Sequence, residues 1–153
     1  MEMHLQWTSR ISLVNGAKLG LLYTVDLQKI PKAPGIYIFA RRFGSNFEAL
    51  YVGRGNNLRS RVKGQFNNLR LMNHIKNASL GKRMVLAGVF RPKPGQKRDK
   101  CLALIERAFI RYFLAEDHDL VNKSGTKLRQ HTIVSAGKHP KKYFRRSIAL
   151  DSK

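Results

Sequence analysis

The sequence has one cysteine and no long apolar segment. The lone Cys101 cannot form an internal disulfide, which is typical of proteins in a reducing compartment. No apolar run approaches the ~18 residues that a membrane span needs, and the N-terminal segment lacks the basic and apolar regions of a signal peptide. We therefore expect a cytoplasmic chain that makes no membrane contact, with secretion as the alternative.

Acidic residues are also scarce. The chain has nine Asp and Glu against 30 Lys and Arg, and its net charge is +21. A charge so far from zero predicts a polyanionic partner, with nucleic acid as the first expectation and an anionic membrane surface or a ribosome-like scaffold as alternatives. Cysteine and histidine do not cluster along the chain, so the sequence predicts no zinc site.

The apolar pattern predicts an α+β fold, in which helices flank a small central β-sheet that is antiparallel at least in part. β-branched and aromatic residues at 35–40 and 49–53 indicate two strands, and the turn-like residues at 41–48 join them as a hairpin. Glycine and asparagine at 55–57 indicate a turn and a helix N-cap. Beyond this cap we expect helices at 58–66, 69–80 and 100–115, a strand at 82–90 and an exposed loop at 91–100.

The 153 residues suit one domain with its own core. Residues 1–33 have no regular apolar period, and Gly16 and Gly20 interrupt any long helix, so we treat this segment as an N-terminal extension. The predicted domain spans residues 34–123. Residues 124–153 are basic and weakly patterned, and we expect them to pack on the domain or to extend it.

One acidic residue lies where a charge is costly. Glu106 falls on the apolar side of the helix predicted at 100–115, close to Leu102 and Phe109. A buried carboxylate is unfavourable unless a partner compensates its charge. That partner is either one of the many arginines or a hard divalent cation such as Mg²⁺, and the pattern leaves both open. The expected apolar stripe of this helix consists of Leu102, Ile105, Phe109, Tyr112 and Phe113.

Three further side chains are candidates for chemistry. Arg61 lies beside the apolar face of its predicted helix, where a guanidinium can either hold a phosphate through two hydrogen bonds or rest its stem on the core. Tyr37 and Tyr51 each lie in a predicted strand, where tyrosine is usually a packing residue. A tyrosine can also act as an acid or base if nearby cations ease the removal of its proton.

These elements follow one another in a definite order. They are GIY at 35–37, YVG at 51–53, Arg61, Glu106 and Asn122. In this order and spacing they resemble the GIY-YIG nuclease superfamily, over roughly residues 34–123. The resemblance implies an endonuclease that hydrolyses DNA phosphodiester bonds with a single Mg²⁺ ion, for which Mn²⁺ is expected to substitute.

The resemblance also implies a role for each matching residue. Glu106 matches the carboxylate that binds the metal ion, and Arg61 matches the arginine that steadies the scissile phosphate. Tyr37 matches a tyrosine proposed as the general base, and Tyr51 matches one that lines the site. Asn122 matches an asparagine that supports the metal and phosphate region.

The chain departs from the family pattern at Gln65. Some members have a histidine or tyrosine at this position, whereas an amide cannot act as an acid or base. We therefore assign the role of base to Tyr37 as the family suggests. The histidines in polar or basic surroundings, His118, His131 and His139, are expected to be solvated.

The basic residues predict where nucleic acid binds. Residues 123–153 carry nine Lys or Arg and one Asp, which favours phosphate contacts of salt-dependent affinity, with a solvated basic tail as the alternative. The expected nucleic-acid contacts are Arg54, Arg59, Lys63, Lys138, Lys141, Lys142, Arg145 and Arg146. DNA is the expected partner, and RNA, a homodimer and a protein partner are left open.

The biological role of such an enzyme is open among restriction or phage defence, DNA repair, a nuclease toxin and a mobile element. Two other functions compete with it. One is a catalytically inactive nucleic-acid-binding protein on the same fold. The other is a ribosome-associated basic protein, which would have no need of a glutamate on the core-facing side of a helix.

Overall fold

The computed structural model describes residues 2–78, 80–122, 129–134 and 147–152, with side chains for the first two ranges. The chain divides into two compact units, Met1–Lys123 and Ser124–Lys153. The predicted α+β class is confirmed, because the larger unit is an antiparallel sheet flanked by helices. No helix in the described ranges is long and apolar enough to cross a membrane.

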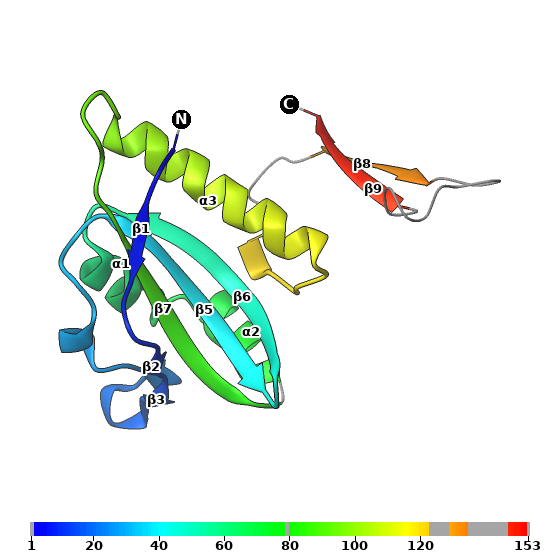
Figure 1. Ribbon diagram of the computed structural model, residues 1–153. Coiled ribbons are helices and arrows are strands. Elements are labelled where there is room, and N and C mark those ends of the chain that lie inside the picture. Colours follow the sequence, from blue (N-terminus) through cyan, green and yellow to red (C-terminus); the bar gives the residue numbers. More distant parts are fainter. Residues whose placement is uncertain (1, 79, 123–128, 135–146, 153) are drawn as a thin grey trace. The chain divides into compact units, whose positions relative to one another are not determined.

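The larger unit is built on a five-stranded antiparallel sheet (Figure 1). The central strand β5 (Gly35–Phe43) pairs with β6 (Asn46–Gly55) on one side and with β7 (Lys82–Phe90) on the other. Two short strands, β1 (Leu5–Trp7) and β2 (Ile11–Ser12), pair with the far side of β7. Within this sheet β6 is therefore an edge strand.

The β5–β6 hairpin is longer than the sequence predicted. The turn expected over 41–48 is confined to two residues, because pairing continues as far as Phe43. Gly44 has a φ of 60°, the conformation that a two-residue hairpin turn needs at its first position. Polar residues occupy the outer part of the hairpin as a cross-strand pair, in which Arg41 Nε lies 2.8 Å from Glu48 Oε1.

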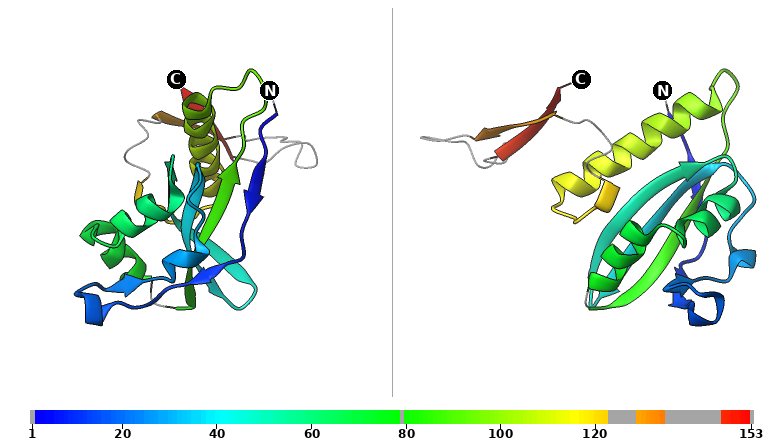
Figure 2. Two further views of the ribbon diagram at one scale, coloured as in Figure 1. Left: turned by 90° about the vertical axis from the view of Figure 1, so that its left-hand side faces the viewer. Right: turned by 180° about the vertical axis from the view of Figure 1, so that it is seen from behind.

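Three helices cover the two faces of the sheet (Figure 2). The helices α1 (Leu58–Gln65) and α2 (Leu69–Asn77) lie on one face, and α3 (Arg98–Ala115) lies on the other. Asparagine side chains start the first two helices. Asn57 Oδ1 accepts a hydrogen bond from the third amide beyond it in α1, as predicted, and Asn68 does the same in α2.

The sheet separates two apolar cores, because successive side chains of a strand point to opposite faces. On β5, Tyr37 and Phe39 face α1 and α2, whereas Ile36 and Ile38 face α3. The lone Cys101 is buried in the second core. Full burial of one such large apolar side chain contributes about 1.5–3 kcal/mol, so both cores fix the positions of the strands that lie between them.

Residues 1–33 are not a separate extension, contrary to our expectation. Their first two strands complete the sheet, Ile11 and Ile30 are buried in the core with α1 and α2, and the Ala33 carbonyl accepts a hydrogen bond of 3.0 Å from the Leu58 amide. Elements of two or three residues leave no detectable apolar period. The remaining short elements of this segment are β3 (Val14–Asn15), η1 (Ala17–Leu19), β4 (Tyr23–Thr24) and η2 (Leu27–Lys29).

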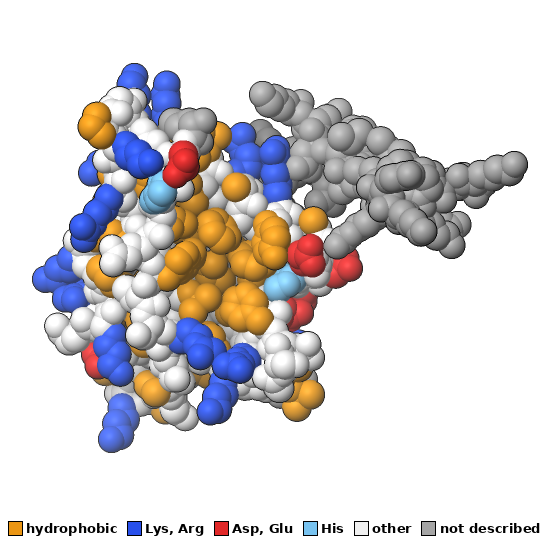
Figure 3. Space-filling model, viewed as in Figure 1, with side chains coloured by type: hydrophobic (Ala, Val, Ile, Leu, Met, Phe, Trp, Pro, Cys, Tyr) orange, Lys and Arg blue, Asp and Glu red, His pale blue; other side chains and the backbone are white. Residues whose placement is uncertain are grey.

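The outer side of α3 carries exposed apolar side chains. Leu104 is 45% exposed, and Tyr112, which we expected in the apolar stripe, is 60% exposed. The buried position at this end of the helix belongs to its neighbour Phe113, and Tyr112 lies about 100° around the helix from it. Figure 3 shows that hydrophobic side chains gather on the face that carries α3 and β1, where Trp7 is 41% exposed.

The smaller unit contains the antiparallel pair β8 (Arg129–Val134) and β9 (Ser147–Ser152). Sequence patterning did not predict these strands. Five of the expected nucleic-acid contacts fall between them, outside the described residues: Lys138, Lys141, Lys142, Arg145 and Arg146.

Candidate active site

The two tyrosines of the motif form a stacked pair on the α1 side of the sheet. Tyr37 is fully buried, Tyr51 is half-buried, and their ring centroids are 6.1 Å apart with an interplanar angle of 24°. Gln65 joins them, since its Nε2 donates to the hydroxyl of Tyr37 at 2.6 Å and to that of Tyr51 at 3.2 Å. Its own Oε1 accepts from Asn68 Nδ2 at 3.1 Å. The pair is thereby held in one orientation.

Sequence reasoning missed the importance of Gln65. Among the described residues it is the buried polar side chain, with 9% of its surface exposed. Buried polar groups need hydrogen-bond partners. The partners of Gln65 are the hydroxyls of Tyr37 and Tyr51 and the side-chain amide of Asn68. The signal was present, because Gln65 shares the apolar side of α1 with Leu58 and Val62.

The state of Tyr37 does not suit a general base. Burial raises the pKa of Tyr37 well above its usual range, and the neighbouring Tyr51 raises it further. The hydrogen bond from Gln65 and the charge of Arg61 lower this pKa, but by less. In the free protein the charge of Arg61 does not offset this burial, so Tyr37 is a neutral phenol.

The glycines of the two tripeptides make room for the site. A Cβ at Gly53 would lie 2.8 Å from Tyr37 Cε1 and closer still to the end of that ring. A Cβ at Gly55 would overlap the side chain of Arg61, and one at Gly35 would overlap the Gly88 carbonyl of the neighbouring strand. The two tripeptide glycines, Gly35 and Gly53, and the nearby Gly55 thus each allow a close approach that a Cβ would obstruct.

Arg61 projects from α1 across Gly55, and it is exposed. In the described part of the chain its guanidinium forms no hydrogen bond and no ion pair. Its positive charge nevertheless affects two side chains, because it lowers the pKa of Tyr37 and also the pKa of Glu106. An uncommitted guanidinium near a tyrosine pair and a carboxylate can bind a phosphate through two hydrogen bonds.

Glu106 lies on α3 with 27% of its side chain exposed. Burial raises the pKa of Glu106, and the charges of Arg54 and Arg61 partly offset this effect. Arg54, on β6, provides the ion pair, with its Nε 3.6 Å from Glu106 Oε1. The arginine alternative for compensating this charge is therefore present in the free protein.

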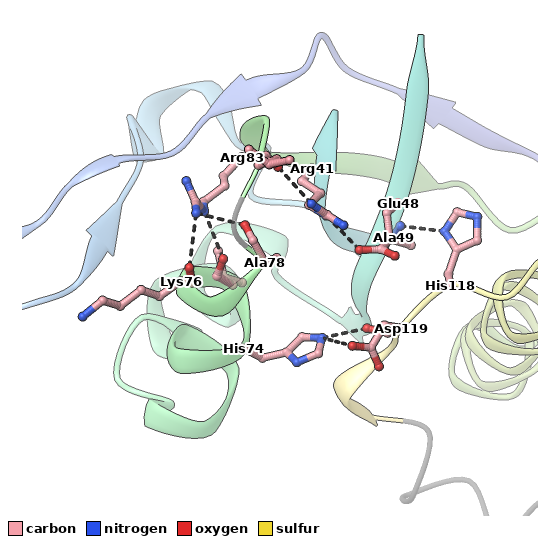
Figure 4. Close-up of polar contacts among 11 residues, drawn as sticks. Arg41, Glu48, Ala49, His74, Lys76, Ala78, Arg83, His118 and Asp119 are labelled. Atoms are coloured by element: carbon pink, nitrogen blue, oxygen red, sulfur yellow. Dashed lines mark hydrogen bonds and ion pairs between the residues drawn. The ribbon is translucent and has the colours of Figure 1, made fainter. Parts of the chain in front are cut away.

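In the free protein Asn122 is bound to the backbone of the edge strand. Its Nδ2 donates to the Val52 carbonyl at 2.5 Å and its Oδ1 accepts from the Val52 amide at 3.5 Å, so it pairs backbone groups that the edge strand β6 leaves open. His118, four residues earlier, pairs one more backbone group of this edge, since its Nδ1 accepts from the Ala49 amide at 2.7 Å (Figure 4). Asn122 thus holds the strand that carries Tyr51, and half-buried His118 is not solvated as expected.

A further polar cluster lies beside this edge and is structural (Figure 4). His74 on α2 bonds the Asp119 carbonyl at 2.7 Å, with the Asp119 carboxylate 3.8 Å away. Arg41 pairs with Glu48, and Arg83 donates to carbonyl groups at the end of α2. These contacts tie α2 to β7 and to the segment after α3, and they join the two strands of the hairpin to each other.

The described basic residues differ in their availability for nucleic acid. Arg59 is partly committed to the protein, because it donates to the carbonyls of Ile30 at 2.8 Å and Gln28 at 3.3 Å, so fewer of its N–H groups are available for phosphate than those of Arg61. Lys63 is exposed on α1, and Arg54 is partly exposed beside Glu106. The side chains of His131 and His139 lie outside the described ones.

No protein-family model matches the chain, and no curated protein or solved structure matches it either. Function must therefore be inferred from the contacts of the site residues themselves.

The residues at the site fit a single hard cation. In the described ranges Glu106 accepts no hydrogen bond, and its one ion pair is longer than a charge-assisted hydrogen bond of about 2.7–2.9 Å. Its oxygens are therefore available as ligands. Mg²⁺ is commonly held by one or two carboxylates, with water and substrate phosphate completing its coordination. No group of three or more acidic, histidine or cysteine side chains gathers at this site or at any other place in the described ranges, so Glu106 would hold the cation as its one carboxylate ligand.

Proposed function

We propose that this chain is an endonuclease of the GIY-YIG type, which hydrolyses phosphodiester bonds of DNA with one divalent cation. The main support is the position of Arg61, whose guanidinium has no hydrogen bond or ion pair with the described residues and whose charge acts on both Tyr37 and Glu106. The net charge of +21 supports a polyanionic substrate.

Each residue then has a distinct role. Arg61 binds the scissile phosphate and stabilises the charge that develops on it. Glu106 would hold the cation, which when bound supplies positive charge to the phosphate and makes a water molecule more acidic. The hydroxyl of Tyr51, half-buried and oriented by Gln65, positions the attacking water. Tyr37, neutral and fully buried, fixes the orientation of Tyr51.

The test is cleavage of supercoiled plasmid by the purified protein in Mg²⁺ and in EDTA. Glu106→Gln removes the carboxylate at the site with little change in shape. Asp99→Asn is the matched control, because Asp99 is also an α3 carboxylate but is 74% exposed and pairs with its neighbour Arg98. Both variants change the net charge equally, so a difference between them reports on the site.

We expect nicking or linearisation that requires Mg²⁺, is lost in Glu106→Gln and persists in Asp99→Asn. Equal activity of Glu106→Gln and the wild type would contradict the proposal. Salt-sensitive DNA binding without cleavage, on plasmid, branched DNA and RNA alike, would favour the inactive nucleic-acid-binding alternative instead.

A further inference from the structure

The ion pair between Arg54 and Glu106 bears directly on the proposed cation site. Arg54 lies near the end of β6, and its side chain is 44% exposed. Its Nε lies 3.6 Å from Glu106 Oε1, and its Nη1 donates a long hydrogen bond of 3.4 Å to the Asp99 carbonyl. Both contacts are loose, and both join β6 to α3.

A cation and this guanidinium would compete for one carboxylate. Two positive groups that share the Glu106 oxygens repel each other at short range. The existing pair is also easy to break, since exposed ion pairs with poor geometry contribute little. A DNA phosphate offers Arg54 a better partner, because a guanidinium binds phosphate oxygens through two short hydrogen bonds.

We propose that Arg54 is a switch residue, which occupies the Glu106 carboxylate in the free protein and releases it to a divalent cation when its guanidinium moves to a DNA phosphate. This inference rests on the proposed function and adds regulation to it. DNA then raises the affinity for the cation, and by thermodynamic linkage the cation raises the affinity for DNA by the same factor. The protein would assemble its cation site only on a substrate.

The experiment measures Mn²⁺ binding rather than cleavage. Bound and free Mn²⁺ are distinguished by electron paramagnetic resonance at about pH 8, where a carboxylate is ionised. Each protein is titrated alone and in the presence of a short DNA duplex, whose integrity is checked afterwards on a denaturing gel. The variants are Arg54→Gln, Glu106→Gln and Arg98→Gln. The last is the charge-matched control, because Arg98 is exposed and pairs with Asp99 rather than with Glu106.

Without DNA, we expect Arg54→Gln to bind Mn²⁺ roughly fivefold to tenfold more tightly than the wild type, in the usual range of coupling between sites. Arg98→Gln should resemble the wild type. The duplex should tighten Mn²⁺ binding by the wild type more than by Arg54→Gln, since the variant has no guanidinium to displace.

The experiment distinguishes a failure of the Arg54 switch from a failure of the proposed cation site. If Glu106→Gln loses Mn²⁺ binding but Arg54→Gln binds Mn²⁺ as the wild type does, with the same response to the duplex, the switch is overturned and the cation site stands. If Glu106→Gln binds Mn²⁺ as tightly as the wild type, with and without the duplex, both the switch and the proposed cation site are wrong.

Discussion

Substituting Gly53 by alanine should damage the tyrosine pair and the stability of the fold together. The added methyl group would lie 2.8 Å from Tyr37 Cε1 and closer still to Cζ and the hydroxyl. Real Cβ atoms essentially never show separations under 3.0 Å, so something must shift. The Tyr37 ring is fully buried against Phe39 and Tyr51, and it can move only by losing its hydrogen bond from Gln65.

The expected cost follows from these contacts. Overpacking of a core costs about 1–3 kcal/mol, and a buried hydroxyl left without its partner costs about 1–3 kcal/mol. Replacing glycine by alanine recovers only about 0.4–1 kcal/mol through the unfolded chain. We therefore expect Gly53→Ala to lower the free energy of unfolding by roughly 1–5 kcal/mol.

The assay is urea unfolding followed by far-ultraviolet circular dichroism and by the fluorescence of the single tryptophan, Trp7. Gly64→Ala is the matched control. A Cβ at Gly64, within α1, would meet no atom within 4 Å, so this change should raise stability by up to about 1 kcal/mol. Gly53→Ala should also lose plasmid cleavage at temperatures where it remains folded. A Gly53→Ala protein as stable and as active as the wild type would refute the assigned role of this glycine.

Further predictions concern the hydrogen bonds and the titrating groups of the site. Gln65→Met should lower the free energy of unfolding by about 1–3 kcal/mol in the same urea assay, because both tyrosine hydroxyls lose their donor; unchanged stability would contradict the network. Since burial raises the pKa of Glu106, its contribution to stability is present below the unfolded-state pKa and is lost as pH rises through the folded-state pKa. Glu106→Gln should therefore gain stability relative to the wild type as pH rises, and a gain confined to acid pH would be the wrong sign. Ultraviolet titration should find one tyrosine that ionises well above the usual pKa of about 10, and Tyr37→Phe should remove that late step.

Much of the fold could be predicted because its main elements are long and regular. The strand 82–90 and the N-cap before the helix at 58–66 carry strong local signals, and the structure has them at the expected places. The partly buried carboxylate of Glu106 followed from its neighbours Leu102 and Phe109 along the same helix.

The features that escaped prediction depend on contacts between distant parts of the chain. Asn122 pairs with Val52, 70 residues away, and no local pattern reveals that an amide will complete a strand edge. β1 and β2 are too short to show an alternation of apolar and polar residues in the sequence, yet they join the sheet beside β7. In the sequence Arg59 looks like a phosphate-binding residue. In the structure its guanidinium donates to carbonyl groups of the N-terminal segment, about 30 residues away along the chain.

The most direct test of the proposed site is the rate of DNA cleavage by Arg61→Gln, measured with protein in excess over DNA so that all of the DNA is bound. Lys63→Gln removes the same charge from the same helix and shows what a loss of binding alone would do. We predict that Arg61→Gln lowers the cleavage rate of bound DNA by about a hundredfold or more, as expected when one charge-stabilising donor is lost. A saturated rate equal to that of the wild type would contradict the assignment of Arg61 to the scissile phosphate.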